Sequence, residues 1–128
     1  MSAHAVVLVD HGSRRAEAGT VVAELAEVLR AELPGREVLV AHLELEPPSV
    51  GEAIDAAVAE GAREVTVLPC FLAPGRHTTG DLPELAAAAE ARHPGVTVRC
   101  AAPLGPHAGV AAALLDRLSE SADPHRTE

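Results

Sequence analysis

Three polar residues stand close behind apolar stretches of the sequence. His11 stands one residue after the apolar run at residues 5–9 (Ala-Val-Val-Leu-Val), His77 lies in a polar loop behind residues 65–72, and Glu44 lies near the end of a third apolar stretch between them. Two imidazoles and one carboxylate suit a divalent ion such as Co, Ni, Fe or Zn, with coordination positions left open. A single loop histidine can equally cap a helix or bond a backbone carbonyl. The metal hypothesis therefore needs a fold that brings the three residues together.

The sequence alternates short apolar runs with stretches of helical periodicity. We expect strands at residues 5–9, 37–45, 64 to 70 or 71, and 96–101, and helices at residues 17–33, 50–60, 83–92 and 109–119. Strands that alternate with helices predict right-handed crossovers and a parallel sheet. We therefore predict a three-layer α/β fold, a four-stranded parallel sheet with helices on both faces. One domain is expected over residues 1–120, with a polar tail at 121–128.

A parallel sheet places all its strand-ending loops on one edge, where open α/β sheets bind ligands. If the first and third strands are neighbours, His11 and His77 flank the crevice. Asp81, in the same loop as His77, is expected either to cap a helix that begins at Pro83 or to take a catalytic role, and the cap is preferred. The polar residues predicted to gather on this edge are Asp10, His11, Ser13, Arg14, Arg15, His42, Glu44, Glu46, Arg76, His77, Thr78, Thr79, Asp81 and His107.

Charge and composition exclude several classes of function. The net charge of -9 and the aromatic content of 1% argue against a nucleic-acid binder, since such proteins use basic grooves and aromatic platforms, and against an anionic-membrane binder. No leader-like or membrane-spanning apolar segment is present, and Cys70 and Cys100 form no Cys-x-x-Cys motif. We expect a cytoplasmic protein with reduced thiols. Gly-x-Ser-x-Gly, Walker and Gly-x-Gly-x-x-Gly patterns are also missing, which disfavours serine hydrolase chemistry and nucleotide binding.

Three segments carry a resemblance to a known family. They are residues 11–14 (His-Gly-Ser-Arg), residues 43–49 (Leu-Glu-Leu with a later Pro-Ser), and residues 69–83 (Pro-x-Phe-Leu-x-x-Gly-x-His-x-x-x-Asp-Leu-Pro). Together they resemble the sirohydrochlorin chelatase family of the CbiX and SirB type, over nearly the whole chain. The chain length is similar to that of the short form, in which a half-domain forms a homodimer. A four-stranded sheet is small and its edges need cover, which also favours a homodimer.

The resemblance implies a lyase that inserts Co2+, or Fe2+ or Ni2+, into sirohydrochlorin, a polycarboxylate tetrapyrrole, for cobalamin or sirohaem biosynthesis. The divalent metal is a substrate, and no organic cofactor is expected. By this resemblance His11 and His77 hold the metal, and Glu44 is the third catalytic residue. The substrate-binding residues that it implies are Ser13, Arg14, Glu44, Phe71, Leu72, Ala73, Pro74, Gly75 and Arg76.

One position departs from the family pattern. The family often has an acidic residue directly before the Pro-Ser pair, where this chain has Pro47, with Glu46 shifted by one. This favours Glu44 over Glu46 as the acidic site residue. The main alternative is a non-catalytic carrier of metal or tetrapyrrole with the same fold. A half-domain subunit of a larger assembly and a protoporphyrin ferrochelatase are further alternatives.

Overall fold

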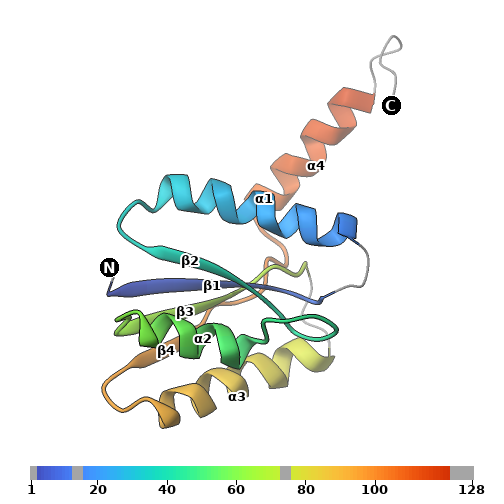
Figure 1. Ribbon diagram of the computed structural model, residues 1–128. Coiled ribbons are helices and arrows are strands. Elements are labelled where there is room, and N and C mark those ends of the chain that lie inside the picture. Colours follow the sequence, from blue (N-terminus) through green and yellow to red (C-terminus); the bar gives the residue numbers. More distant parts are fainter. Residues whose placement is uncertain (1–2, 13–15, 73–75, 122–128) are drawn as a thin grey trace.

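The computed structural model describes the backbone of residues 3–12, 16–72 and 76–121, and the side chains of these residues except 16–19 and 76–81. Strands and helices alternate along the whole described chain, as the sequence predicts (Figure 1). The elements are β1 (His4–Asp10), α1 (Ala16–Glu32), β2 (Glu37–His42), α2 (Val50–Ala59), β3 (Glu64–Pro69), α3 (Arg76–Arg92), β4 (Thr97–Cys100) and α4 (Ala108–Ser121).

The four strands form one parallel sheet in the order β2-β1-β3-β4. The central strand β1 pairs with β2 on one side, where Leu8 lies opposite Val40, and with β3 on the other, where Leu8 lies opposite Leu68. The neighbouring first and third strands that the site hypothesis needs are therefore present. The direction of strand addition reverses between β1 and β3, which makes their carboxyl ends the expected ligand crevice of the fold.

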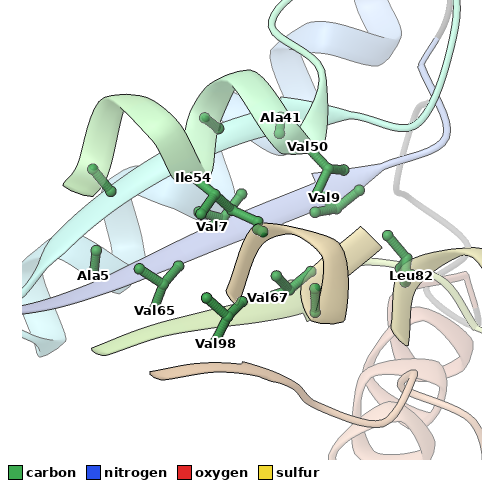
Figure 2. Packing of buried hydrophobic residues seen from close by; sticks show 14 of the residues in the cluster. Ala5, Val7, Val9, Ala41, Val50, Ile54, Val65, Val67, Leu82 and Val98 are labelled. Carbon is green, nitrogen blue, oxygen red and sulfur yellow. The ribbon is translucent and has the colours of Figure 1, made fainter. Parts of the chain in front are cut away.

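Alternate residues of β1 face opposite layers, because side chains along a strand point alternately to the two faces of the sheet. Val7 and Val9 lie in the larger core cluster together with α2 and α3, and Figure 2 shows them packed near Ile54 of α2. Val6 and Leu8 face the other way and pack with residues of α1. A strand buried on both faces explains the continuous apolar run at residues 5–9.

The helices complete the three predicted layers. On one face α1 packs through Val22 and Ala26, and on the other α2 packs through Ile54 and α3 through Leu82 and Ala89. The last helix is different, because no residue of α4 is buried and the helix projects away from the sheet (Figure 1). Among the described residues, no helix is both long and apolar enough to cross a membrane.

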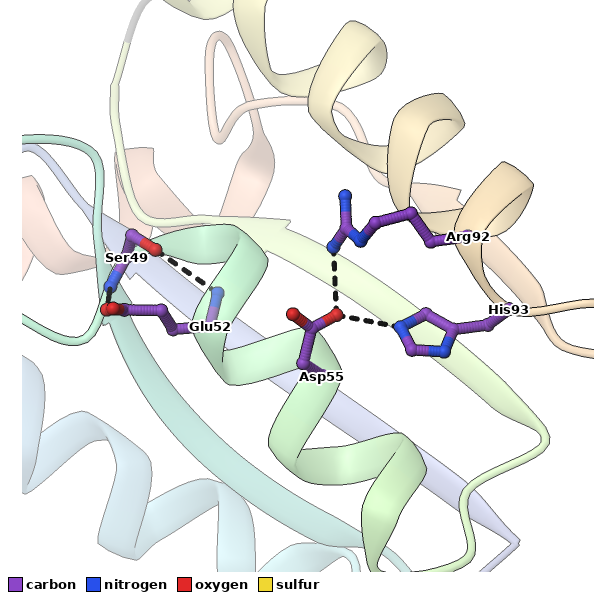
Figure 3. Close-up of polar contacts among 5 residues, drawn as sticks. All are labelled: Ser49, Glu52, Asp55, Arg92 and His93. Atoms are coloured by element: carbon purple, nitrogen blue, oxygen red, sulfur yellow. Dashed lines mark hydrogen bonds and ion pairs between the residues drawn. The ribbon is translucent and has the colours of Figure 1, made fainter.

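Two polar contacts fix α2 (Figure 3). At its start, Glu52 N donates to Ser49 Oγ at 3.1 Å and Ser49 N donates to Glu52 Oε1 at 2.8 Å, which is a capping box. Further along, Asp55 Oδ1 lies 2.8 Å from Arg92 Nη2 and 2.7 Å from His93 Nε2, at the end of α3. Hydrogen bonds from Arg92 and then from His93 hold the pKa of the Asp55 carboxyl below its usual value.

Two predicted boundaries are wrong. The second strand ends at His42 and not at Leu45, because Leu45 turns the chain with a φ of 75°. The third helix begins at Arg76 and not at Pro83, so Asp81 lies inside α3 and cannot be its N-cap. Proline is usual at a helix start, but Pro83 lies within α3. An interior proline removes one backbone N–H from the helical hydrogen bonds and crowds the carbonyl of the preceding turn.

Candidate active site

The candidate site lies at the carboxyl ends of β1 and β3. His11 directly follows β1, and its ring lies against the ring of Phe71, which follows β3. The two ring centroids are 4.2 Å apart and the planes are tilted by 41°. Phe71 is buried at 4% exposure in the larger core cluster, so it provides a fixed wall for the exposed imidazole. The one phenylalanine of the chain therefore stands at the crevice.

Glu44 lies beside His11 because backbone hydrogen bonds between the first two strands continue past their ends. Beyond the last strand pair, Leu43 N donates to Asp10 O at 2.9 Å and Glu44 N donates to His11 O at 3.1 Å. The loops after β1 and β2 thus stay paired for two residues after the strands end. This pairing places Glu44 beside His11, with the Glu44 side chain exposed.

Gly12 permits this close approach of the two loops. Its φ of 93° lies in a region that favours glycine, and a Cβ at this position would overlap the carbonyl oxygen of Glu44. Any side chain at position 12 would therefore push the two loops apart. The glycine that follows His11 is a geometric requirement of the site.

A carboxylate–imidazole pair lies directly behind His11. His42 Nδ1 is 2.6 Å from Asp10 Oδ1 and 3.7 Å from Glu46 Oε2, and His42 is 7% exposed. A carboxylate only accepts hydrogen bonds, so Nδ1 of His42 donates to Asp10. His42 is expected on this edge from the sequence, but its pairing with Asp10 is not. Asp10 lies opposite His42 in the register of β1 and β2, which the structure fixes and the sequence does not.

Cys70 follows β3 and is partly buried. Its backbone N–H donates to Val9 O of β1 at 2.7 Å. Burial, and then the negative charge of Asp10, raise the pKa of the Cys70 thiol. Burial likewise raises the pKa of the Cys100 thiol. A raised pKa disfavours the thiolate, which is the metal-binding form of cysteine.

An apolar groove of about 640 Å³ adjoins the site at Leu72. The loop after β4 forms its floor and is held in place because Leu104 N donates to Phe71 O at 2.9 Å and Gly105 N donates to Leu72 O. His107 lies at the rim, where its Nδ1 accepts a hydrogen bond from Gly109 N at 2.8 Å. The groove is lined by Leu72, Gly105, Pro106, His107, Ala108, Val110, Ala111 and Leu114.

The structure brings together part of the predicted set: His11, Glu44 and Phe71, with Leu72 exposed beside them. His77 lies in the first turn of α3, but its side chain and those of Arg76 and Asp81 are outside the described part. Within the side chains that are described, no group of three or more His, Cys, Asp or Glu residues could hold a metal ion. The metal pair His11–His77 stays a prediction. The predicted site residues outside the described backbone are Ser13, Arg14, Arg15, Ala73, Pro74 and Gly75.

The fold and the site define a doubly wound α/β domain that gathers His11, Glu44 and Phe71 at the carboxyl ends of its strands. The family model for CbiX matches residues 5–121. The chain belongs to the CbiX family.

Curated relatives match the chain over part of their length. It is 40% identical over 105 residues to the chloroplastic sirohydrochlorin ferrochelatase of Arabidopsis thaliana, covering 82% of this chain and 47% of the relative. It is 41% identical over 81 residues to the sirohydrochlorin cobaltochelatase of Methanococcus maripaludis, covering 63% of this chain and 56% of the relative. The chain thus spans about half the length of these curated relatives.

Two solved structures share the fold. A putative cobalamin biosynthesis CbiX protein from Marinobacter aquaeolei has a TM-score of 0.80 and 34% identity, covering 92% of this chain and 96% of that one. The sirohydrochlorin chelatase SirB from Bacillus subtilis subspecies spizizenii, solved in complex with cobalt, has a TM-score of 0.83 and 29% identity, covering 93% of this chain and 50% of that one. The same unit therefore matches one chain of its own length and half of a longer chain.

Proposed function

We propose that this protein is a sirohydrochlorin chelatase, a lyase that inserts Co2+, or Fe2+ or Ni2+, into sirohydrochlorin. The observation that carries the proposal is the position of His11, held against Phe71 and beside Glu44 at the crevice of the sheet. Membership of the CbiX family and the names of the curated relatives support the substrate and the reaction. The product would serve cobalamin or sirohaem biosynthesis, and no organic cofactor is part of the proposal.

The proposed metal site is an open one. His11 and His77 bind the incoming ion, and Glu44 adds a carboxylate from the neighbouring loop. An ion that must leave for the macrocycle needs few protein ligands and free coordination positions, because a closed four-ligand cage retains its metal. Imidazole and carboxylate ligands accept Co, Ni and Fe alike, so metal supply would decide which ion is inserted.

Insertion also requires a group that removes two pyrrole protons. His11, His77 and Glu44 are the proposed acceptors, since histidine titrates near neutral pH and a carboxylate can relay a proton to solvent. His42 stands behind His11 and would not touch the macrocycle. Its hydrogen bond to Asp10 fixes the end of β1, from which His11 projects.

The macrocycle is proposed to dock over residues 71–76. Phe71 offers a buried flat wall and Leu72 an exposed apolar contact beside it. The substrate carries carboxylates and the protein has a net charge of -9, so local positive charge is needed at the rim. Arg14, Arg15 and Arg76 are the residues proposed to supply it.

We further propose that the active form is a homodimer in the cytoplasm, with the catalytic domain at residues 1–120 and a polar tail at 121–128. Support for the dimer comes from length, because this unit matches half of the longer SirB chain but nearly all of the Marinobacter chain. Light scattering on the purified protein at micromolar concentration would give a dimer mass. A monomer at that concentration would contradict the dimer.

The activity is tested by an anaerobic assay with sirohydrochlorin and Co2+, Fe2+ or Ni2+, supplied one at a time. A catalytic amount of protein is expected to accelerate the change in the absorption spectrum above the spontaneous rate with at least one metal. Binding of metal or tetrapyrrole without acceleration by any of the three would contradict the chelatase proposal and favour a carrier.

A further inference from the structure

The Asp10–His42 pair lies on the opposite face of the sheet from the His11 ring. Side chains alternate between the two faces along a strand, so Asp10 shares a face with Leu8, which packs in the core cluster with α1. His42 is opposite Asp10 in the register of the two strands. The His11 ring lies against Phe71, which belongs to the core cluster on the α2 and α3 side. Any effect of the pair on His11 therefore passes through the backbone.

His42 is also the residue on which the loop that carries Glu44 closes. β2 ends at His42, and the chain returns to it because His42 N donates to Pro48 O at 2.9 Å. Within the same loop, Glu46 Oε2 lies 3.7 Å from His42 Nδ1. Both ends of the loop at residues 43–48 are therefore held at one residue.

Three hydrogen bonds join this loop and His42 to the end of β1. Two run between backbone groups, from Leu43 N to Asp10 O and from Glu44 N to His11 O. The third joins side chains, from His42 Nδ1 to Asp10 Oδ1 at 2.6 Å. Because His42 is only 7% exposed, this bond lies in surroundings of low dielectric, where hydrogen bonds are stronger than in water. The side-chain bond thus ties together the two chain segments from which His11 and Glu44 project.

We propose that His42 is a positioning residue, which holds Glu44 and His11 in the relative position that metal insertion requires. It acts through Asp10 on the end of β1 and through Pro48 on the loop, and it touches neither the metal nor the macrocycle. Such support matters to the rate, because a displacement of reacting groups by about 1 Å can slow a reaction by roughly 100-fold. This inference deepens the proposed function and rests on it.

The test compares His42→Leu with His42→Asn. The two new side chains are close in size, and only the asparagine amide can donate a hydrogen bond to Asp10 from near the position of Nδ1. We expect His42→Leu to lower kcat for sirohydrochlorin metallation by about 10-fold or more. The KM for sirohydrochlorin should stay within about twofold of the wild-type value, because the macrocycle wall at Phe71 is unaltered. His42→Asn should recover most of the lost kcat.

Ser49→Ala controls for a general loss of stability. It removes the Oγ that accepts from Glu52 N, just beyond the same loop, and does not alter the Asp10–His42 pair. We expect it to lower the unfolding midpoint in urea and to leave kcat unchanged. Circular dichroism checks that each variant is folded under the assay conditions.

The same two substitutions at Asp10 repeat the test from the other side of the pair, and they decide it should His42→Leu not fold. Asparagine at this position still accepts a hydrogen bond from His42, whereas leucine does not. Asp10→Asn should therefore keep most of the wild-type kcat, and Asp10→Leu should lose it.

A folded His42→Leu protein with the wild-type kcat would overturn the positioning role and leave the chelatase proposal standing. Equal losses of kcat in the leucine and asparagine variants would also overturn it, because the effect would then not depend on the hydrogen bond. An equal loss in Ser49→Ala would do the same, since stability alone would explain it. A wild-type protein without chelatase activity would overturn the proposed function and this role with it.

Discussion

At the scale of single residues, the candidate site depends on close contacts between the ends of β1, β2 and β3. His11 lies against Phe71, its carbonyl accepts a hydrogen bond from Glu44 N, and Gly12 allows the two loops to touch. Behind this layer Asp10 pairs with His42. Each of these contacts can be removed by one substitution whose effect differs from that of a matched change elsewhere.

Gly12→Ala should be strongly destabilising, because the new Cβ overlaps the Glu44 carbonyl and the backbone is in a left-handed conformation. We expect a loss of more than about 2 kcal/mol in the free energy of unfolding, measured by urea denaturation. Gly35→Ala is the control, since a Cβ there has no atom within 4 Å. Its effect should stay within about 1 kcal/mol, and equal losses for both variants would contradict the role given to Gly12.

His42→Ala removes the partner of a partly buried carboxylate, Asp10. Leaving that group without its hydrogen bond should cost about 1–3 kcal/mol of stability at pH 7. His4→Ala breaks an exposed pair with Glu64 and should cost less than about 1 kcal/mol. Chemical denaturation of both variants measures the difference, and a His42 variant as stable as the His4 variant would show that the inner pair is not structural.

At the scale of elements, apolar patterning predicts the strands and the helices but not all of their ends. The alternation of β and α segments follows from the apolar runs, and the parallel sheet follows from crossover rules. The neighbouring positions of β1 and β3 were a condition of the site hypothesis, and the strand order of the structure meets it. The end of β2 depends on the backbone conformation of Leu45, which a leucine does not signal. The start of α3 lies among Thr and Gly residues of low helix propensity, so the polar composition predicted a loop there.

The contact between α2 and α3 gives a prediction for pH dependence. The pKa of Asp55 is lowered in the folded state by Arg92 and His93, so its contribution is present above the unfolded pKa of about 3.9 and is lost as pH falls through the folded value. Because Asp55 is half exposed, Asp55→Asn should cost under about 1 kcal/mol at pH 7.

Urea denaturation of the Asp55→Asn variant and the wild type at pH 7 and at pH 3 measures that dependence. The stability difference should shrink at the lower pH. Glu84→Gln, which removes an exposed carboxylate from α3, controls for the loss of one negative charge. A stability difference between wild type and Asp55→Asn that grows on acidification would contradict a stabilising role of the ionised Asp55 carboxylate.

At the scale of the whole molecule, the sequence predicts some residues of the candidate site, and others are found only in the folded structure. The residues of the candidate site could be predicted in part because strand-ending loops meet at one edge, and His11, Glu44 and Phe71 do meet there. The Asp10–His42 pair could not, since it depends on strand register. The uncovered α4 could not either, because its amphipathic pattern looks the same for a helix that packs on its own sheet.

The central claim is that His11 acts directly in metal insertion, and one comparison tests it most directly. Initial rates of sirohydrochlorin metallation are measured anaerobically for His11→Ala and for His4→Ala, a histidine at the opposite end of the same strand. Loss of a metal ligand or proton acceptor should lower the rate of the His11 variant by about 100-fold or more, while the His4 variant stays near the wild-type rate. A folded His11→Ala protein with the wild-type rate would contradict the account.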